Sequence, residues 1–262
     1  MTSKQVMLTA WMTCLLCGCQ FLGPTGDEAW QDFVRGKGAQ ELRSPYDPPR
    51  VWIVAPFRNE SGNARVDELR VTDQLIRQLE NASGLDVLPL NRTLEAMESL
   101  EMDVVRTPAE ARTILATVGG ADAILVGSIT AYDPYDPPKL GLKLELYDPV
   151  SRGGRSLSGM EVRELSRTAT GDAAIGPMPG DRPMSLISHH FDAADPDMRS
   201  LMKRYANRRG VTGIDDDEWR LYRISMDLFT EFVSYVAGWR LLHAETVRLA
   251  GSRQEAYDQP AP

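Results

Sequence analysis

Histidines limit the metal-ion and acid–base chemistry that this chain can perform. The sequence contains three of them: His189, His190 and His243. The strongest candidate for catalysis or metal binding is the segment from His189 to Asp192, since histidine and aspartate together can bind a metal ion or relay a proton. Adjacent residues in an extended segment point to opposite sides, however, so neighbouring histidines rarely bind one ion. We therefore predict no catalytic residue and no metal site, and keep a metal-dependent hydrolase using His189 and His190 as an alternative.

Motifs for nucleotide, hydrolase or zinc chemistry are absent from the sequence. The pairs Gly119-Gly120 and Gly153-Gly154 lack the spacing of a phosphate-binding loop, and neither a G-x-S-x-G nor an H-E-x-x-H motif occurs. The acidic run 215–217 is explained by the first turn of a helix, where negative charge is favourable. No cofactor is expected.

Two Tyr-Asp-Pro repeats stand between two predicted strands, over residues 132–138. Tyrosines are enriched at the centres of protein interfaces, so the repeats predict a contact site for a partner protein. The candidate contact residues are Tyr132, Asp133, Tyr135 and Asp136. The alternative is a rigid loop, because proline and aspartate also favour tight connections for conformational reasons.

The three cysteines, Cys14, Cys17 and Cys19, all lie near the start of the chain, so no disulfide can crosslink the remainder. Lys4 precedes an apolar run over residues 6–16 that is too short to span a bilayer, which is typical of a signal peptide. The sequence Leu16-Cys17-Gly18-Cys19 resembles the lipobox of bacterial lipoproteins. An amphipathic or buried N-terminal helix with incidental cysteines is the alternative.

The lipobox resemblance implies cleavage before Cys19 and acylation of that cysteine. Two or more acyl chains hold a protein stably on a membrane. Gln20 follows the cysteine, and in Gram-negative bacteria this residue favours the outer membrane over the inner one. The expected location is therefore the cell envelope, on the outer membrane and facing the periplasm.

Hydrophobic periodicity predicts an α/β domain in which these segments form a mixed sheet flanked by helices. Strands are expected at 51–57, 85–90, 121–132, 140–147 and 160–165, and helices at 66–80, 94–100 and 108–118. The order is β-α-β-α-α-β-β-β. Thr107-Pro108-Ala109-Glu110 is a capping box with proline at the first helical position, which fixes the start of the third helix.

Helices are added after this domain. They are expected near 196–208 and over 216–249, and the second either kinks near Gly238 or projects at its end. The predicted organisation is a signal peptide (1–18), a lipidated N terminus and tether (19–50) with a short helix near 27–34, the α/β domain (51–167), a mobile loop (168–195), a C-terminal helical extension (196–250) and a tail (251–262).

Overall charge restricts the partners. The formal net charge is -8 and the pI about 5.0, whereas nucleic-acid-binding domains are typically basic. We predict no nucleic-acid partner.

Residues 51–62 (VWIVAPFRNESG) and 120–128 (GADAILVGS) resemble two short motifs of a group of envelope lipoproteins. The group includes the curli secretion-channel lipoprotein and the lipoprotein activators of penicillin-binding proteins, and the resemblance covers about residues 51–166. It implies an α/β fold, and the activators have no known catalytic residues. The charged outer face of the predicted 140–165 hairpin argues against a membrane pore.

The sequence therefore predicts a non-enzymatic, membrane-anchored adaptor or assembly factor that binds an envelope protein. A subunit of an oligomeric secretion assembly, which implies a homo-oligomer, and the hydrolase are the alternatives.

Overall fold

A computed structural model describes residues 26–36, 41–149, 182–209 and 218–258. The chain divides into two compact units, residues 1–40 and 41–262. In the first unit the described element is the helix α1 (Gly26–Val34), which confirms the short helix expected there. The signal peptide, Cys19, residues 160–165 and the acidic run 215–217 lie outside the described residues.

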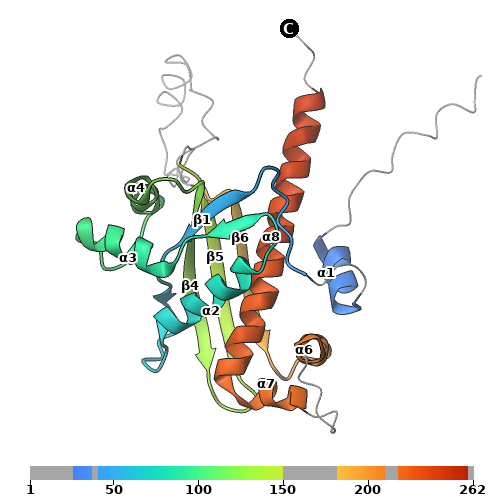
Figure 1. Ribbon diagram of the computed structural model, residues 1–262. Helices are drawn as coiled ribbons and strands as arrows, with labels where there is room; N and C mark the ends of the chain where they lie inside the picture. Colours follow the sequence, from blue (N-terminus) through green and yellow to red (C-terminus); the bar gives the residue numbers. More distant parts are fainter. Residues whose placement is uncertain (1–25, 37–40, 150–181, 210–217, 259–262) are drawn as a thin grey trace, which may run out of the picture. The chain divides into compact units, whose positions relative to one another are not determined.

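The second unit is built on a six-stranded mixed sheet (Figure 1). Its strands are β1 (Arg50–Val54), β2 (Arg58–Asn59), β3 (Leu85–Val87), β4 (Ala123–Asp133), β5 (Lys139–Tyr147) and β6 (Ser185–Asp192). The order is β3-β1-β4-β5-β6, with β2 paired to β4. Strands β1 to β4 run parallel, whereas β5 and β6 are antiparallel to their neighbours. The predicted α/β class with a mixed sheet is confirmed.

Helices cover both faces of this sheet. They are α2 (Glu68–Glu80), α3 (Leu90–Ser99), α4 (Pro108–Val118), α6 (Pro196–Arg208), the 3-10 turn η1 (Glu218–Arg220), α7 (Leu221–Ile224) and α8 (Met226–Asp258). α3 and α4 bury Met97 and Ile114 against Ile53 and Ile124 of the sheet. On the other face α2 and α8 pack against each other, in front of the sheet in Figure 1.

The start of α4 follows from local sequence chemistry. Thr107 Oγ1 accepts a hydrogen bond from the Glu110 N–H at 3.2 Å, and the Glu110 carboxylate accepts one from the Thr107 N–H at 3.2 Å. The Arg106 N–H donates to the same carboxylate at 2.6 Å, which lowers the pKa of Glu110. The predicted capping box and helix 108–118 are therefore confirmed.

One expectation about strands is wrong. Residues 185–192, placed in a mobile loop, form β6 along the edge of the sheet. β5 pairs with β4 on one side and with β6 on the other, whereas the strand expected at 160–165 lies outside the described residues. β6 could not be recognised from its sequence, because it lacks the apolar pattern of a buried strand. Leu186 is 50% exposed, and Phe191 is the only large apolar side chain that the strand buries.

The domain also begins earlier than predicted. Residues 41–50 were assigned to a tether, yet Leu42, Ser44 and Tyr46 are buried and the compact unit starts at Glu41. The first strand is shorter than expected: β1 ends at Val54, and the chain resumes as β2 after Pro56. Proline cannot donate to a strand ladder, which explains the interruption.

The predicted helix 216–249 is two helices. α7 ends at Ser225, whose backbone is extended, and α8 then runs to Asp258 through part of the predicted tail. Of the two alternatives, a kink near Gly238 or a projecting end, α8 shows a helix that continues through Gly238. A Cβ at this position would lie 3.4 Å from Leu42 and 3.5 Å from Leu79, at ordinary contact distance, so α8 packs there against both α2 and the 41–50 segment.

Candidate functional site

The candidate site lies beyond the carboxyl end of β1, beside the middle of β4. From β1 the chain passes through α2 to β3 on one side, and then through α3 and α4 to β4 on the other side. β1 and β4 therefore flank a topological switch point, where open α/β sheets bind their ligands. A cleft of about 530 Å³ opens here, between the segment 56–60, the first turn of α2 and the residues Asp103, Val104 and Arg106.

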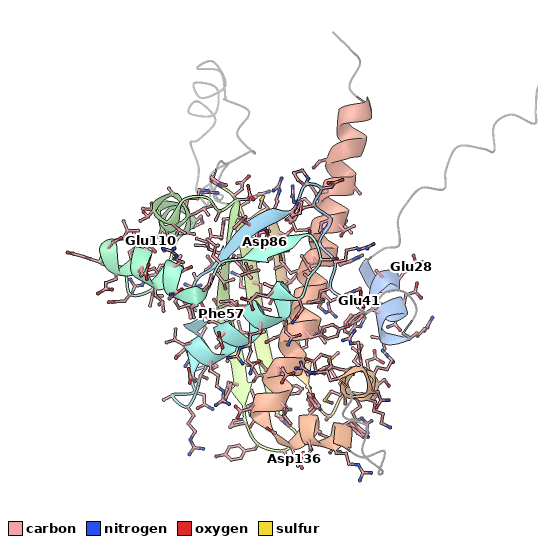
Figure 2. All side chains as sticks on the ribbon, viewed as in Figure 1. Glu28, Glu41, Phe57, Asp86, Glu110 and Asp136 are labelled. Atoms are coloured by element: carbon pink, nitrogen blue, oxygen red, sulfur yellow. The ribbon has the colours of Figure 1, made fainter. Side chains whose placement is uncertain are left out.

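Phe57 forms the floor of this cleft and is 4% exposed. A Cβ on Gly127 would approach three ring carbons of Phe57 to less than 3.0 Å, so the ring occupies the space that a side chain at position 127 would need. The Phe57 N–H donates to Thr72 Oγ1 of α2 at 3.0 Å. Phe57, at the centre of the domain in Figure 2, thus links β1, β4 and α2.

A polar network continues from Phe57. Arg58 Nη2 donates to Ser128 Oγ at 3.1 Å and pairs with the Glu60 carboxylate at 2.8 Å. Ser128 Oγ in turn donates to Glu60 at 3.1 Å. Because Ser128 is 1% exposed, this network has little freedom and fixes the direction of the segment 58–60. The two short motifs that carried the family resemblance therefore contact each other in space.

The same segment leads to the predicted contact residues. Asn63 Nδ2 donates to the carbonyl oxygen of Tyr132 at 3.2 Å, and Arg65 Nη1 donates to the hydroxyl of Tyr135 at 2.7 Å. Asp133 accepts a hydrogen bond from the Tyr135 N–H at 3.2 Å, which shapes the loop between β4 and β5. The polar loop 58–66 and the Tyr-Asp-Pro loop therefore lie side by side.

The four predicted contact residues have different environments. Tyr135 is 65% exposed, and Asp133 and Asp136 are also exposed. Tyr132 instead is half-buried and lines a small cavity between α2 and α8, and burial raises the pKa of its hydroxyl. A partner can contact Tyr135, Asp133 and Asp136 directly, whereas Tyr132 is half-buried beside α2 and α8.

Apolar side chains that the sequence did not single out lie beside these contact residues. Arg223 of α7 lies 3.9 Å from the Asp136 carboxylate, and its neighbours Leu221 and Ile224 are 47% and 56% exposed. They are three residues apart, so they share one side of the helix. A signal was present, since Ser225 followed by Asp227 is suited to start a helix.

We call this region the distal surface. It consists of Arg65, Tyr135, Asp136, Leu221, Arg223 and Ile224. Figure 2 shows Asp136 where the β4–β5 loop meets α7, at the lower end of the domain.

The three histidines lie in different environments. In β6 the side chain of His189 is half-buried and packs edge-on against Phe191, with ring centroids 4.6 Å apart, whereas His190 is exposed on the other side. Burial and the charge of Arg240 lower the pKa of His189 to about 4. His243 stacks on Trp239 of α8, and burial lowers its pKa too. Within the described residues no three potential ligand side chains are grouped to hold a metal ion.

None of the helices in the described ranges has both the length and the apolar character that crossing a bilayer requires.

Comparison with known proteins gives distant likenesses only. No protein-family model matches the sequence, and no curated protein sequence matches it. The crystal structure of the lipoprotein GNA1162 from Neisseria meningitidis is similar over 64% of this chain and 100% of its own, with 14% identity and a TM-score of 0.36. The C-terminal domain of LpoB from Salmonella enterica is similar over 46% of this chain and 82% of its own, with 17% identity and a TM-score of 0.33.

A third solved structure is the hypothetical protein CT253 from Chlamydia trachomatis. It is similar over 73% of this chain and 98% of its own, with 11% identity and a TM-score of 0.35. Structures with partial likeness to this chain thus include lipoproteins. At these identities and TM-scores the likenesses assign the chain to no family.

Proposed function

We propose that this protein is a lipid-anchored adaptor of the cell envelope that binds a partner protein through the distal surface. The observation that carries the proposal is the exposure of Tyr135, Leu221 and Ile224, 65%, 47% and 56%, around the ion pair of Arg223 and Asp136. Interface centres are enriched in tyrosine and arginine, and apolar side chains there are surrounded by polar ones. The distal surface has this composition.

Rigidity of the support favours the same proposal. A side chain that is already held in place loses less conformational entropy when a partner binds. Tyr135 is held through its hydroxyl by Arg65 and through its N–H by Asp133. The ring is thereby oriented before binding while most of its area stays open to a partner.

Crosslinking in living cells tests the binding surface. A photo-reactive amino acid replaces Tyr135, and the control carries it at Val247 of α8, which is similarly exposed at 53%. We expect the probe at position 135 to capture one envelope protein that the probe at position 247 does not. Equal capture at both positions, or none at position 135, would refute the assignment of this surface.

The same experiment distinguishes an adaptor from a subunit of an oligomeric secretion assembly. Capture of a second copy of this chain at position 135 supports an oligomeric assembly, whereas capture of a different protein supports the adaptor.

The anchor is tested independently. The lipobox-like sequence that ends at Cys19 motivates this part of the proposal. We expect the mature protein to begin at Cys19 with a mass that includes acyl chains, and Cys19→Ser to release it from membranes. An unmodified cysteine in the native protein removes the anchor from the proposal. Fractionation of the membranes tests the outer-membrane location.

A further inference from the structure

Residues 41–49 lie between the first unit and the first strand of the sheet, and we call them the strap. Arg43 forms a single parallel bridge with Ser83. The Ser44 N–H donates to the Ser83 carbonyl at 2.9 Å, and Ser44 Oγ donates to the Gly84 carbonyl at 2.6 Å. The Ser83 N–H also donates to the Leu42 carbonyl at 3.1 Å. These few bonds contrast with β1, which is paired to β3 on one side and to β4 on the other. The strap is therefore paired along one side only, whereas β1 is paired along both.

Two side chains fix the strap to the domain. Leu42 is 5% exposed and lies against Gly238 of α8. Tyr46 is 8% exposed, packs edge-on against Trp52 with ring centroids 5.9 Å apart, and has the Arg50 guanidinium 4.6 Å from its ring centroid. Its hydroxyl reaches the carboxylate of a buried residue of α8.

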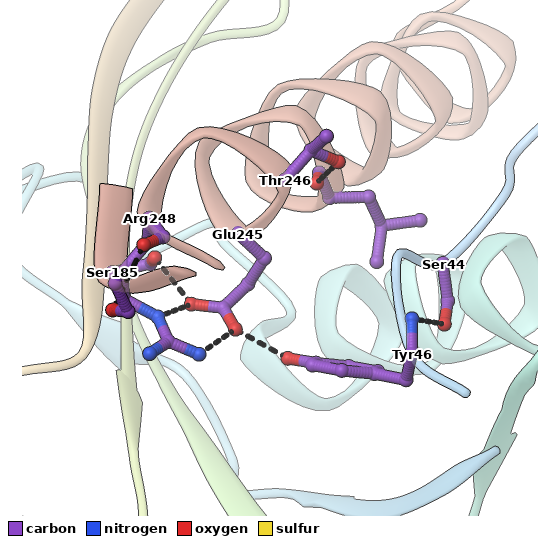
Figure 3. Close-up of polar contacts among 8 residues, drawn as sticks. Ser44, Tyr46, Ser185, Glu245, Thr246 and Arg248 are labelled. Atoms are coloured by element: carbon purple, nitrogen blue, oxygen red, sulfur yellow. Dashed lines mark hydrogen bonds and ion pairs between the residues drawn. The ribbon is translucent and has the colours of Figure 1, made fainter. Parts of the chain in front are cut away.

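That residue is Glu245, which has no exposed surface and four hydrogen bonds (Figure 3). Tyr46 and Ser185 each donate a hydroxyl to it at 2.5 Å, one to each oxygen. Arg248 donates through Nε and Nη2, both at 2.7 Å. Burial opposes the ionisation of Glu245, but the bonds from Arg248, Ser185 and Tyr46 outweigh it and lower the pKa.

The hydrogen bonds to Glu245 allow the strap to detach without leaving the buried carboxylate unpaired. A buried carboxylate that loses its partner is strongly destabilising. If Tyr46 departs, Glu245 keeps the two bonds from Arg248 and the one from Ser185. Three of four hydrogen bonds thus remain, and the opening exposes the fourth acceptor position to water.

We propose that the strap is a releasable latch: Tyr46 on Glu245 holds it closed, and its release lengthens the chain between the membrane anchor and the sheet. Nine extended residues span up to about 30 Å. The length gained is a property of the strap itself, whereas its use at the membrane rests on the proposed lipid anchor. With the strap closed the sheet stays nearer to the anchor, and with the strap released it can lie farther away.

Amide hydrogen exchange in the full-length protein, purified in detergent, tests the latch. Urea is added below the unfolding transition. A local opening exposes little surface and depends weakly on urea, whereas global unfolding depends strongly on it. We expect amides of the strap, including Ser44, to exchange faster than those of β4 and with a weak dependence on urea. An equal urea dependence for the strap and β4 would overturn the proposal, because the strap would then leave only with the whole sheet.

A variant tests the role of Tyr46. Tyr46→Phe keeps the ring and removes one hydrogen bond to a charged group, so strap amides should exchange about 10- to 100-fold faster. Tyr135→Phe is the matched control, since it removes an exposed hydroxyl bonded to Arg65, and it should leave strap exchange unchanged. Unchanged exchange in Tyr46→Phe would also refute the latch. The mass of the native N terminus tests the lipid anchor separately. Failure of the latch is therefore seen in hydrogen exchange, and failure of the anchor in the mass.

Discussion

Two glycine-to-alanine substitutions test the packing that positions the candidate site. Gly127 lies on β4 beneath the ring of Phe57, where a Cβ would come closer than 3.0 Å to three ring carbons. Phe57 is 4% exposed and fixed through its N–H to Thr72, so it has little room to move. Overpacking of this kind costs about 1–3 kcal/mol. We expect Gly127→Ala to lower the free energy of unfolding by about that amount.

The second substitution is expected to act in the opposite direction. At Gly238 the new Cβ would lie 3.4 Å from Leu42 and 3.5 Å from Leu79, at the near edge of ordinary contact distance. Glycine in the interior of a helix is about 1 kcal/mol less favourable than alanine. Gly238→Ala should therefore leave stability unchanged or raise it by up to about 1 kcal/mol.

Urea unfolding at pH 7, followed by circular dichroism, measures both variants against the parent protein. A partner substitution identifies the cause: Phe57→Leu shortens the side chain that the new methyl group meets, so it should cost less in the Gly127→Ala background than alone. A Gly127→Ala protein as stable as the parent would refute the close packing of Phe57 on β4. So would additive costs in the double variant.

Three further predictions concern charge and exposure. Glu245→Gln leaves Arg248 without its buried anion and should lower the free energy of unfolding by about 3–5 kcal/mol, measured by urea unfolding, whereas a loss below 1 kcal/mol would contradict a buried ion pair. His189 has a pKa lowered to about 4, below the unfolded value of about 6.5, so its unfolded form binds a proton first and stability should fall as the pH drops from about 6.5 to 4. His189→Gln should reduce that slope, and an unchanged slope would show that His189 is solvated. Tyr135→Ala should change the urea midpoint little but weaken co-purification of the partner that crosslinking identifies, and normal co-purification would argue against the distal surface.

Local chemistry made part of the fold predictable from the sequence. The start of α4 could be predicted because the capping box involves residues three apart, and its bonds form as expected. The strict alternation over residues 140–147 likewise predicted β5, whose leucines are buried. In both cases the determining contacts lie within one element or on one face of it.

Contacts between distant residues could not be predicted in this way. β6 carries polar residues at most positions and is a strand because β5 offers it a pairing edge. Tyr46 and Glu245 are 199 residues apart, and nothing in either neighbourhood indicates that they meet. For the same reason residues 41–50 resembled a linker, since their proline-rich sequence does not reveal that α8 covers them.

The candidate site could also be predicted only in part from the sequence. The Tyr-Asp-Pro repeats were identified by composition, which suffices for an exposed loop. The apolar residues of α7 were missed because residues 216–249 were taken as one long helix, which gave no reason to single out Leu221 and Ile224. The motif residues Phe57 and Gly127 were noted separately, but only the fold brings the ring onto the glycine.

The register of β5 and β6 gives the domain two poles. Ser185, which binds Glu245, pairs with Leu146 at one end of β5, whereas Asp192 pairs with Lys139 at the other end, beside the Tyr-Asp-Pro loop. Leu146 and Lys139 are seven residues apart along β5, which separates these ends by about 24 Å. The Tyr46–Glu245 contact and the exposed ring of Tyr135 therefore lie towards opposite ends of the same strand, so a partner can bind Tyr135 without touching the residues that hold the strap.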